Sequence, residues 1–407
     1  MKILQRLKFS MNGKSVKFVS YFLTFYIASL IIFKMHYIII PHILNLLLIA
    51  SFFYVVFITK EYIFNINSLI TVYALFSVFA LASSFWGIGF EEPSFRSAQL
   101  FMILINLFII YNIIKKLNMY DAFLNGVLLG SLVNYIFILG ILPAPFPIID
   151  QLGHRYFGTV GNSNVLSMIM LTSILISIIY LRKEQKISKI FYYYQYINIL
   201  LAVYMIFLTV SKKGIVSGLL LITIFLLVTM KNPKHFLKLM SFIGIGIISL
   251  FYYVDLDTFL SVADRIILRF TQVGTSLSSN TNFGSTGERR YFIILGWDYF
   301  TSTPLFGHGL NNFRLVARTY SHNNYIELLF GVGLIGATIF YSIYYFLLKI
   351  IKDMKDSNLK VIFLTYILIL LMMDMAQVSY GNKFILYTLV YLSAFAENDC
   401  CNNVKVA

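Results

Sequence analysis

The stretch Ser321-His322-Asn323-Asn324-Tyr325-Ile326-Glu327 stands where a long polar loop runs into an apolar segment that continues to about Leu348. A segment of this length and apolarity predicts a membrane helix, because roughly 20 residues span a bilayer. A histidine, two amides and a carboxylate at the mouth of such a helix are costly, since polar side chains lose water there. We therefore interpret this stretch as the functional centre and the rest of the chain as its scaffold.

Composition places the chain among membrane proteins. Of 407 residues, 59% are hydrophobic and only 12% are charged, whereas a soluble globular chain has about 25% charged residues. The sequence predicts an all-α polytopic protein with residues 1–407 as one integral membrane domain. No nucleic-acid partner is expected.

Apolar runs of roughly 17–25 residues define twelve predicted membrane helices. The ninth and the last are short, so eleven is the alternative. The first lacks a following small-residue cleavage site and is interpreted as a retained helix rather than a signal peptide. The runs are Val16–Phe33, Tyr37–Ile58, Ile66–Phe85, Ser97–Ile114, Ala122–Leu142, Asn164–Leu181, Ile190–Val210, Gly214–Met230, Leu239–Tyr253, Asn324–Leu348, Val361–Val378 and Phe384–Ala396.

Charge sets the predicted orientation. With both termini in the cytoplasm, most Lys residues fall on the inner side, as the positive-inside rule requires. The Arg residues do the opposite, and a planar guanidinium grips phosphate oxygens in pairs. An outer anion site, for a phosphate or pyrophosphate, is the prediction; chance and loop solubility are the alternative. Eight of the ten Arg lie outside: Arg96, Arg155, Arg265, Arg269, Arg289, Arg290, Arg314 and Arg318.

His322 is predicted to lie in the first turn of its helix, with Ser321 as N-cap. The helix dipole and nearby arginines disfavour imidazolium, so the neutral ring can serve as a general base. A capping or interfacial histidine is the alternative. Asn323 and Asn324 are candidate substrate contacts. Glu327 lies on the same helical face as Asn323. It is predicted to accept a hydrogen bond from Asn323 or to form an ion pair with a loop arginine.

Residues 254–321 form the predicted long outer loop. Within it, Arg289 and Arg290 open an aromatic, helical run from Tyr291 to Phe300, and the glycines of Pro304–Gly309 bend the chain back toward His322. Arg289 is the preferred phosphate ligand, with Arg290 beside it. An arginine that snorkels to the membrane interface is the alternative.

Two further outer segments carry candidate substrate ligands. Lys212 and Lys213 form a cationic turn against the positive-inside trend. Arg155 precedes a glycine-containing loop that ends in amides at Asn164, which suits an anion or a sugar. Lipid headgroups are the alternative ligands for both segments. Asp374 is predicted to make a structural polar contact within the eleventh helix.

Other patterns do not carry function. The glycine spacing of Gly331–Gly336 lies inside an apolar helix and is assigned to close helix packing. The pair Asp255 and Asp257 is too small for a metal site, and the scattered histidines His36, His42 and His235 make no metal cluster. We predict no metal and no cofactor.

Several of these segments resemble the bacterial O-antigen polymerase and O-antigen ligase family. The resemblance covers Arg155 to about Gly336 and is most specific where the His-Asn run follows the Pro-Leu-Phe-Gly loop. It rests on Gly158–Asn164, on Ser211-Lys212, on Glu288-Arg289 followed fifteen residues after Arg289 by Pro304–Gly309, and on Ser321-His322-Asn323-Asn324 ahead of Glu327 and Gly331.

The resemblance implies a metal-independent, inverting glycosyltransferase with a glycosyltransferase C-like fold. Its donor is a glycan linked to undecaprenyl pyrophosphate, used on the extracytoplasmic side of the bacterial inner membrane. His322 resembles the family's proposed base, and Arg289 resembles the arginine that holds the donor pyrophosphate. This chain has Ser211-Lys212 where the family usually has a Ser-Arg pair. Lysine keeps the positive charge but lacks the planar guanidinium that binds two phosphate oxygens.

The resemblance predicts a polymerase for O-antigen or capsule repeat units, which moves the growing glycan onto the next lipid-linked unit. The first alternative is a ligase that transfers glycan to a lipopolysaccharide core, lipid A core or another acceptor. The second is a flippase for lipid-linked oligosaccharide. Membrane lipid and a chain-length regulator protein are the other expected partners.

Overall fold

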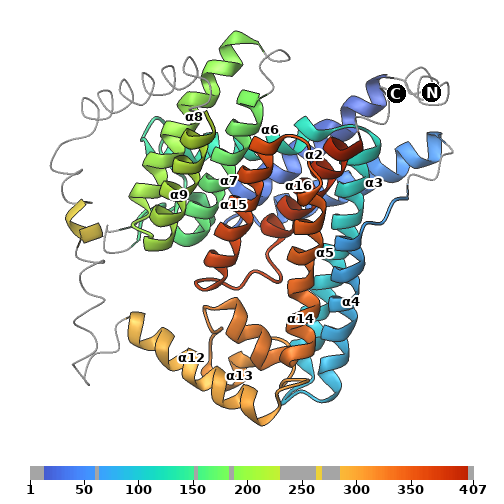
Figure 1. Cartoon of the computed structure of the whole chain (residues 1–407), viewed down its shortest axis with the longest axis vertical. Coiled ribbons are helices and arrows are strands. Elements are labelled where there is room, and N and C mark those ends of the chain that lie inside the picture. The colour runs from blue at the N-terminus through green and yellow to red at the C-terminus, as the bar shows by residue number, and fades with distance from the viewer. Residues whose placement is uncertain are drawn as a thin grey trace.

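The structure is a computed structural model that describes residues 13–59, 64–150, 155–182, 188–229, 263–267 and 285–401. Within these ranges it holds no β-strand, only α-helices and the two short 3-10 helices η1 (Ser83–Phe85) and η2 (Gly158–Val160) (Figure 1). This confirms the all-α prediction. The α-helices are α2 (Gly13–Ile32), α3 (Ile39–Thr59), α4 (Ser68–Ala82), α5 (Glu91–Lys116), α6 (Tyr120–Ile138), α7 (Ser163–Arg182), α8 (Lys189–Leu208), α9 (Lys212–Thr229), α12 (Ser285–Ser302), α13 (Phe313–Ala317), α14 (Asn324–Lys352), α15 (Ser357–Asp374) and α16 (Lys383–Cys401).

Eight helices among the described residues are long and apolar enough to cross a membrane, and Lys17–Ile32 forms a shorter apolar helix. This supports the polytopic class with fewer qualifying spans than the twelve predicted. The predicted ninth segment, Leu239–Tyr253, lies outside the described residues. The start of α5 was predicted too late, because the helix begins at Glu91 rather than Ser97, which places Arg96 inside it.

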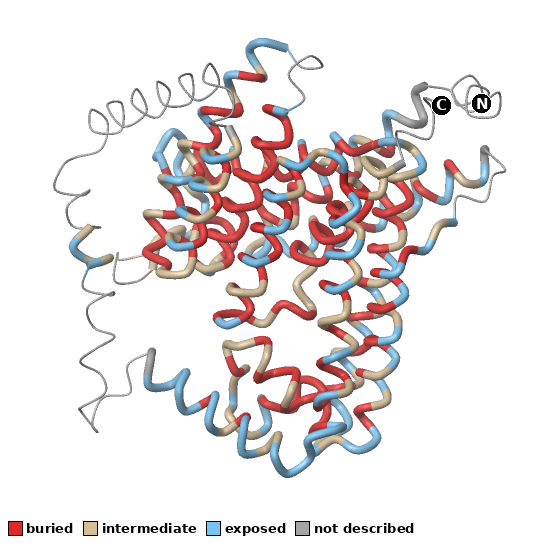
Figure 2. The backbone as a smooth tube through the Cα atoms, viewed as in Figure 1, coloured by how far each residue is buried: buried red, intermediate tan, exposed pale blue. Residues whose placement is uncertain are grey.

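Helix α7 lies at the centre of the bundle, where it packs against α6, α8, α9 and α15. Nearly all of its residues are buried, and Figure 2 shows the buried positions concentrated around it and around α15 and α16. Small hydroxyl side chains on α7 allow close helix approach. At Gly214 of α9, a Cβ would lie only 2.6 Å from Cβ of Ser167. This contact holds the start of α9 against the start of α7.

Residues 285–332, which we call the α12 lobe, lie at one end of the molecule, away from α2 and α16 (Figure 1). The lobe has its own apolar cluster of Phe292, Phe313, Ile326 and Phe330. It is also tied to the α4–α5 connection, because the Trp86 indole N–H donates to the Phe306 carbonyl at 3.1 Å. The predicted helical run in the long loop is confirmed, and the helix begins earlier than predicted, at Ser285.

Helix α14 is broken at Gly333, whose φ of 63° and ψ of −167° are not helical. The bend of Pro304–Gly309 fills the break. The His308 and Gly309 N–H groups donate to the carbonyls of Phe330 and Gly331, each at 2.8 Å. In return, the Leu334 N–H donates to the Pro304 carbonyl at 2.8 Å. The loop thus replaces the bonds that the helix loses, which a buried backbone in a membrane protein requires.

The glycine run of Gly331–Gly336 lies within α14 and packs closely against neighbouring atoms, as predicted, and its Gly333 forms the break. At Gly333, a Cβ would lie 2.4 Å from the carbonyl carbon of Leu305. Only glycine admits another backbone at that distance and adopts the positive φ at low cost. The break fixes how the α12 lobe sits on the membrane helices.

We expect Gly307→Ala to destabilise the protein by on the order of 3 kcal/mol, because φ is positive there and the close neighbours are backbone atoms. Its Cβ would lie 2.6 Å from the Gly333 nitrogen. The thermal unfolding midpoint of detergent-purified protein tests this. Gly287→Ala in α12 is the matched control, since a Cβ there would meet no atom within 4 Å. Equal midpoints for both variants would contradict the docking of the loop in the break.

Candidate functional site

His322 lies just before α14, and the prediction that it sits in the first helical turn was wrong. The helix begins at Asn324 with Asn323 as N-cap, whose side chain accepts from the N–H groups of Tyr325 and Ile326 at 3.0 and 3.3 Å. Ser321 is thus not the N-cap; its hydroxyl donates to the Asn323 carbonyl at 2.7 Å. His322 has a φ of 57°, a left-handed conformation that histidine adopts more readily than most residues.

Glu327 holds this turn in place from inside the protein. Its side chain is buried, and Oε2 accepts from the Ser321 N–H at 2.8 Å. The predicted partners were Asn323 or a loop arginine, and the hydrogen bond goes instead to the backbone beside His322. Oε1 has no hydrogen-bond partner among the described residues. Glu327 is therefore a positioning residue for the His322 backbone.

The imidazole of His322 is half-buried between aromatic rings. The ring of Tyr320 lies 4.1 Å away between centroids, and the ring of Phe292 in α12 lies 6.2 Å away and is nearly parallel. Burial lowers the pKa of His322 below 6.5, the positive charge of Arg289 lowers that pKa further, and Glu288 opposes both. Because a lower pKa keeps the imidazole neutral, the ring can accept a proton near neutral pH.

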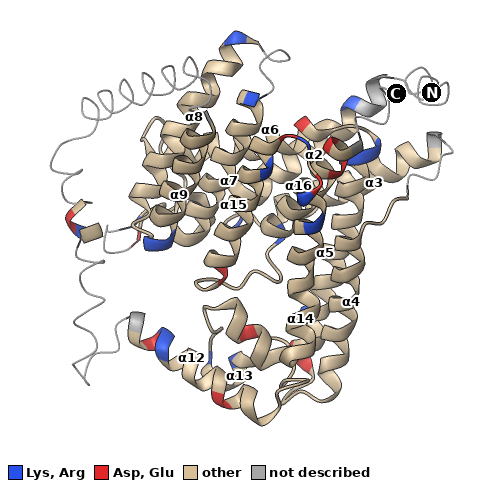
Figure 3. Ribbon diagram, viewed as in Figure 1, with Lys and Arg blue, Asp and Glu red and all other residues tan. Residues whose placement is uncertain are grey.

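Arg289 also faces the start of α9, where Lys212 and Lys213 stand. These lysines occupy the first helical turn rather than the predicted loop turn. Lys213 lies within electrostatic reach of both Arg289 and Asp374. Figure 3 shows the basic residues of α12 and α9 at the ends of the two helices. Arg289 thus acts electrostatically on both His322 and Lys213, and the N-terminal end of the α9 dipole adds partial positive charge at Lys213.

A hydrogen-bond network fixes the start of α9. The Ser211 hydroxyl accepts from the Gly214 N–H at 3.2 Å and donates to Oδ1 of Asn164 at 2.9 Å. Asn164 was predicted to contact substrate, and in the structure its amide oxygen links the first turn of α7 to the residue before Lys212. Val210, one residue earlier, has a φ of 49°, which is strained for a β-branched side chain. The lysines are held by a tight, defined turn.

Asn324, also a predicted substrate contact, uses its whole amide inside the protein. Oδ1 accepts from the N–H groups of Ser379 and Tyr380 at 2.9 and 3.2 Å. Nδ2 donates to the Tyr341 hydroxyl at 3.0 Å and to Oδ2 of Asp374 at 3.3 Å. An amide offers two donors and two acceptor positions. Asn324 therefore joins α14 to the α15–α16 connection, and Asp374 makes the polar contact that the sequence predicted.

The other predicted site residues lie elsewhere in the structure or farther from His322. Arg155 is tied to the end of α8, since its Nε donates to the Thr209 carbonyl at 3.1 Å. Thr159 in the following loop is fixed by Asn134, which accepts its N–H at 3.0 Å. Arg290 is exposed on α12 next to Arg289. His154, His235 and the Asp255–Asp257 pair lie outside the described residues.

Sequence reasoning missed two residues of this region, Tyr320 and Tyr380. The Tyr320 ring packs against His322 in a tilted arrangement, and Arg314 lies within electrostatic reach of both Tyr320 and Glu327. Tyr380 accepts the Arg96 guanidinium on its ring face at 5.0 Å. Arg314 and Arg96 belonged to the predicted outer arginine set, but no local pattern paired them with Glu327 or Tyr380. Within the described residues, no three His, Cys, Asp or Glu side chains are grouped to hold a metal.

The fold and this region define an all-α, multi-spanning membrane protein with a cationic region beside a neutral histidine. Residues 197–341 match a family described as O-antigen ligase. The matched segment contains α9, α12 and the start of α14, and with them Lys212, Lys213, Arg289 and His322. This match supports the O-antigen ligase and polymerase family, a family of glycosyltransferase-like enzymes. No curated protein matches the chain.

Proposed function

We propose that the protein is a polysaccharide polymerase of the bacterial inner membrane. It transfers a glycan from an undecaprenyl pyrophosphate carrier to the next lipid-linked repeat unit on the extracytoplasmic side. The observation that carries the proposal is that Arg289 of α12 lies within electrostatic reach of both His322, just before α14, and Lys213, in the first turn of α9. The α12 lobe lies at one end of the molecule, beyond the membrane helices α9 and α15 (Figure 1), which fits a site outside the membrane.

The positive charges of this region are suited to stabilise the departing pyrophosphate. In the proposed transfer, the bond between the anomeric carbon and the pyrophosphate oxygen breaks, and negative charge develops on that oxygen. Arg289, Lys212 and Lys213 are placed to neutralise it, with the N-terminal end of α9 adding a partial positive charge. Arginine contributes a fork for two phosphate oxygens, and lysine contributes a point charge.

His322 is suited to take the proton of the acceptor hydroxyl. The acceptor hydroxyl oxygen forms the new bond to the anomeric carbon, and its proton passes to the His322 imidazole, which later releases the proton to water. Attack from the side opposite the pyrophosphate inverts the anomeric configuration. Glu327 contributes through the Ser321 N–H, because it fixes the backbone that carries the imidazole. A positioned base typically accelerates such a step by about 100-fold to 10,000-fold.

An apolar groove on α14 supports a lipid-linked donor. The groove encloses about 490 Å³ and is lined by Tyr325, Leu329, Leu334, Ala337, Thr338, Tyr341, Ser342 and Tyr345. It lies on both sides of the break at Gly333, and its wall residue Tyr341 donates to Oδ2 of Asp374 at 3.3 Å. A polyprenyl chain in this groove would bring its pyrophosphate toward Asn324 and the lysines of α9.

The test supplies purified protein with a synthetic undecaprenyl pyrophosphate repeat unit as its only substrate and resolves the products by size. A ladder of lipid-linked oligomers is the expected result. The matched family is described as a ligase, so a second reaction contains lipid A core as an added acceptor. Transfer only in that second reaction would replace the polymerase with a ligase. No transfer in either reaction, with the cell's own repeat unit, would refute the transferase and leave the flippase to be tested.

The pH dependence of this reaction follows from the lowered pKa of His322. His322 acts as a base only when its imidazole is neutral. The transfer rate is therefore constant at pH values above the pKa of His322 and falls as the pH drops through that pKa. Because burial and Arg289 both lower that pKa, we expect kcat/KM to fall on acidification only below pH 6.5. We call this fall the acidic limb of the pH profile. An acidic limb above pH 6.5 would contradict a buried base beside Arg289.

A further inference from the structure

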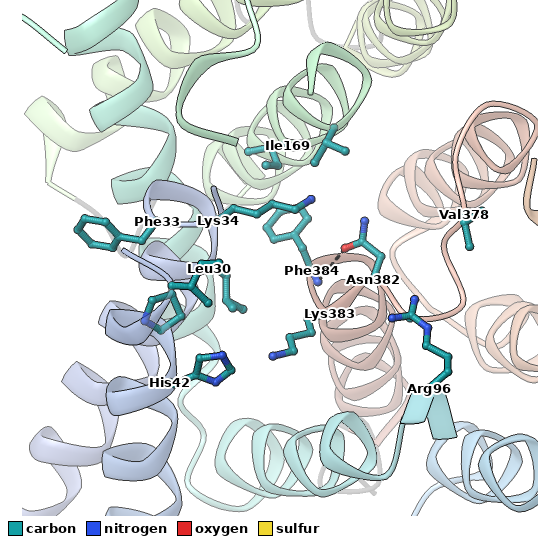
Figure 4. Close-up of a pocket in the computed structure, with 14 residues that line it drawn as sticks. Leu30, Phe33, Lys34, His42, Arg96, Ile169, Val378, Asn382, Lys383 and Phe384 are labelled. Carbon is teal, nitrogen blue, oxygen red and sulfur yellow. Dashed lines mark hydrogen bonds between the residues drawn. The ribbon is translucent and has the colours of Figure 1, made fainter. Parts of the chain in front are cut away.

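A second cationic cavity lies on the other side of α7 from the lysines of α9. It encloses about 340 Å³ between the α2–α3 connection, α5, α7 and the start of α16. Four basic side chains line it, namely Lys34, His42, Arg96 and Lys383, and none of its fourteen lining residues is acidic. Figure 4 shows Lys383 extending from α16 toward His42, with Lys34 and Arg96 on two further sides. Such a cavity is built for an anion.

Arg96 gives this cavity a fixed cationic wall. One end of its guanidinium donates to Oε1 of Gln99 at 2.6 Å, and the group lies over the Tyr380 ring. Its Nε is buried and has no hydrogen-bond partner among the described residues. A buried donor without a partner is costly, and the positive charge of this guanidinium at the cavity wall would be stabilised by an anion in the cavity. Gly381 allows this arrangement, since a Cβ there would lie 2.3 Å from a guanidinium nitrogen.

The open side of the cavity faces apolar surface. Ile38, which lines it, is 56% exposed, and α3 continues outward with Ile39 and Leu46 each 65% exposed. In a membrane protein, exposed aliphatic side chains of this kind contact lipid chains. An anion that carries a hydrocarbon chain could therefore place its charge in the cavity and its chain along α3.

The inner wall connects the cavity to the region around His322. The wall residue Gly381 follows Tyr380, whose N–H donates to Oδ1 of Asn324 at 3.2 Å. Asn324 is two residues from His322. The α15–α16 connection thus separates two cationic regions, one with Arg289 and Lys213 and the other with Arg96 and Lys383. A reaction that transfers a glycan from one lipid-linked pyrophosphate substrate to the sugar of another needs a cationic region for each substrate.

We propose that this cavity binds the phosphate-bearing headgroup of the lipid acceptor, while the Arg289 region holds the donor. This assignment rests on the proposed transferase function. The phosphate would contact Arg96 and Lys383, with Lys34 at the rim, and the prenyl or acyl chain would lie along α3. The acceptor sugar would extend past the α15–α16 connection toward His322.

The experiment measures farnesyl diphosphate binding to the full-length protein in nanodiscs of zwitterionic lipid, with no transfer reaction. Arg289→Ala combined with Lys212→Gln and Lys213→Gln serves as the background, because it removes all three proposed donor contacts and leaves the residues of the cavity unchanged. We expect Lys34→Gln with Lys383→Gln to weaken the remaining binding by at least about tenfold. Gly381→Ala should also weaken it, because the new Cβ displaces the Arg96 guanidinium. Lys349→Gln with Lys352→Gln, in the last turn of α14, is the matched control and should change nothing.

Unchanged binding in the folded Lys34 and Lys383 variant would overturn the proposal. Equal affinity for inorganic diphosphate would show a site for free anions, and displacement by phosphatidylglycerol would show a site for bulk phospholipid; either result would overturn the acceptor assignment. The binding measurement does not depend on catalysis. Binding as expected with no transfer in either reaction would therefore reject the transferase and retain a lipid-phosphate site.

Discussion

Replacing His322 by asparagine is expected to lower the transfer rate by at least about 100-fold without loss of stability, because the variant lacks the base but tolerates the backbone. The φ of 57° at this position suits asparagine, whereas alanine there costs about 1 kcal/mol of strain. His322→Ala should therefore lose both rate and stability. Initial rates and thermal unfolding midpoints of the two purified variants measure the two effects separately.

His36 supplies the control for this pair. It lies outside the site and stacks on Phe146 with a 4.3 Å centroid distance, so His36→Asn should keep nearly the full rate. If His322→Asn retained the wild-type rate while correctly folded, the imidazole would not be the base. The Ser321–Asn323 turn would then act through its backbone and caps alone.

Removal of Arg289 is the second large effect. Arg289→Ala should lower the rate by about 100-fold, since one preorganised donor at a developing charge has that typical worth. It should also move the acidic limb of the pH profile upward, because Arg289 lowers the pKa of His322. Without this charge, the imidazole is protonated at higher pH and is lost as a base earlier on acidification. The rate of the Arg289→Ala variant as a function of pH measures both changes.

Glu288 provides the opposite control on the same turn of α12. Its carboxylate raises the pKa of His322, so Glu288→Gln should move the acidic limb downward with little loss of rate at neutral pH. Limbs that move in opposite directions would establish that Arg289 and Glu288 act on one titrating group. If neither variant moves the limb, the titrating group is not His322.

The class of protein was largely predictable because hydropathy is a property of residues that are neighbours in the sequence. Membrane helices, the helical run after Arg289 and the bend at Pro304–Gly309 all follow from residues that are neighbours in the chain. The family resemblance also rests on short local runs, and the match over residues 197–341 covers several of them. The excess of arginine outside the predicted helices indicated an anion before any contact was known.

Local starts of helices were less predictable, because capping depends on which side chain reaches an N–H group. Ser321 and Asn323 both have the chemistry of an N-cap, and the sequence did not decide between them. Asn323 takes the cap because Glu327 turns back to the Ser321 N–H and the chain is left-handed at His322. The result moves the histidine out of the helix and toward α12.

The sequence by itself determined that this is an all-α membrane protein with a histidine at the mouth of a helix and arginines gathered near it. Only the tertiary structure decided that α14 breaks at Gly333 to admit the Pro304–Gly309 bend, and that Arg289 of α12 lies within electrostatic reach of Lys213 of α9. It also decided that Arg96 and Lys383 line one cavity. Apolarity acts on each segment alone, whereas these contacts join segments tens to hundreds of residues apart, so their polar partners exist only once the helices have packed.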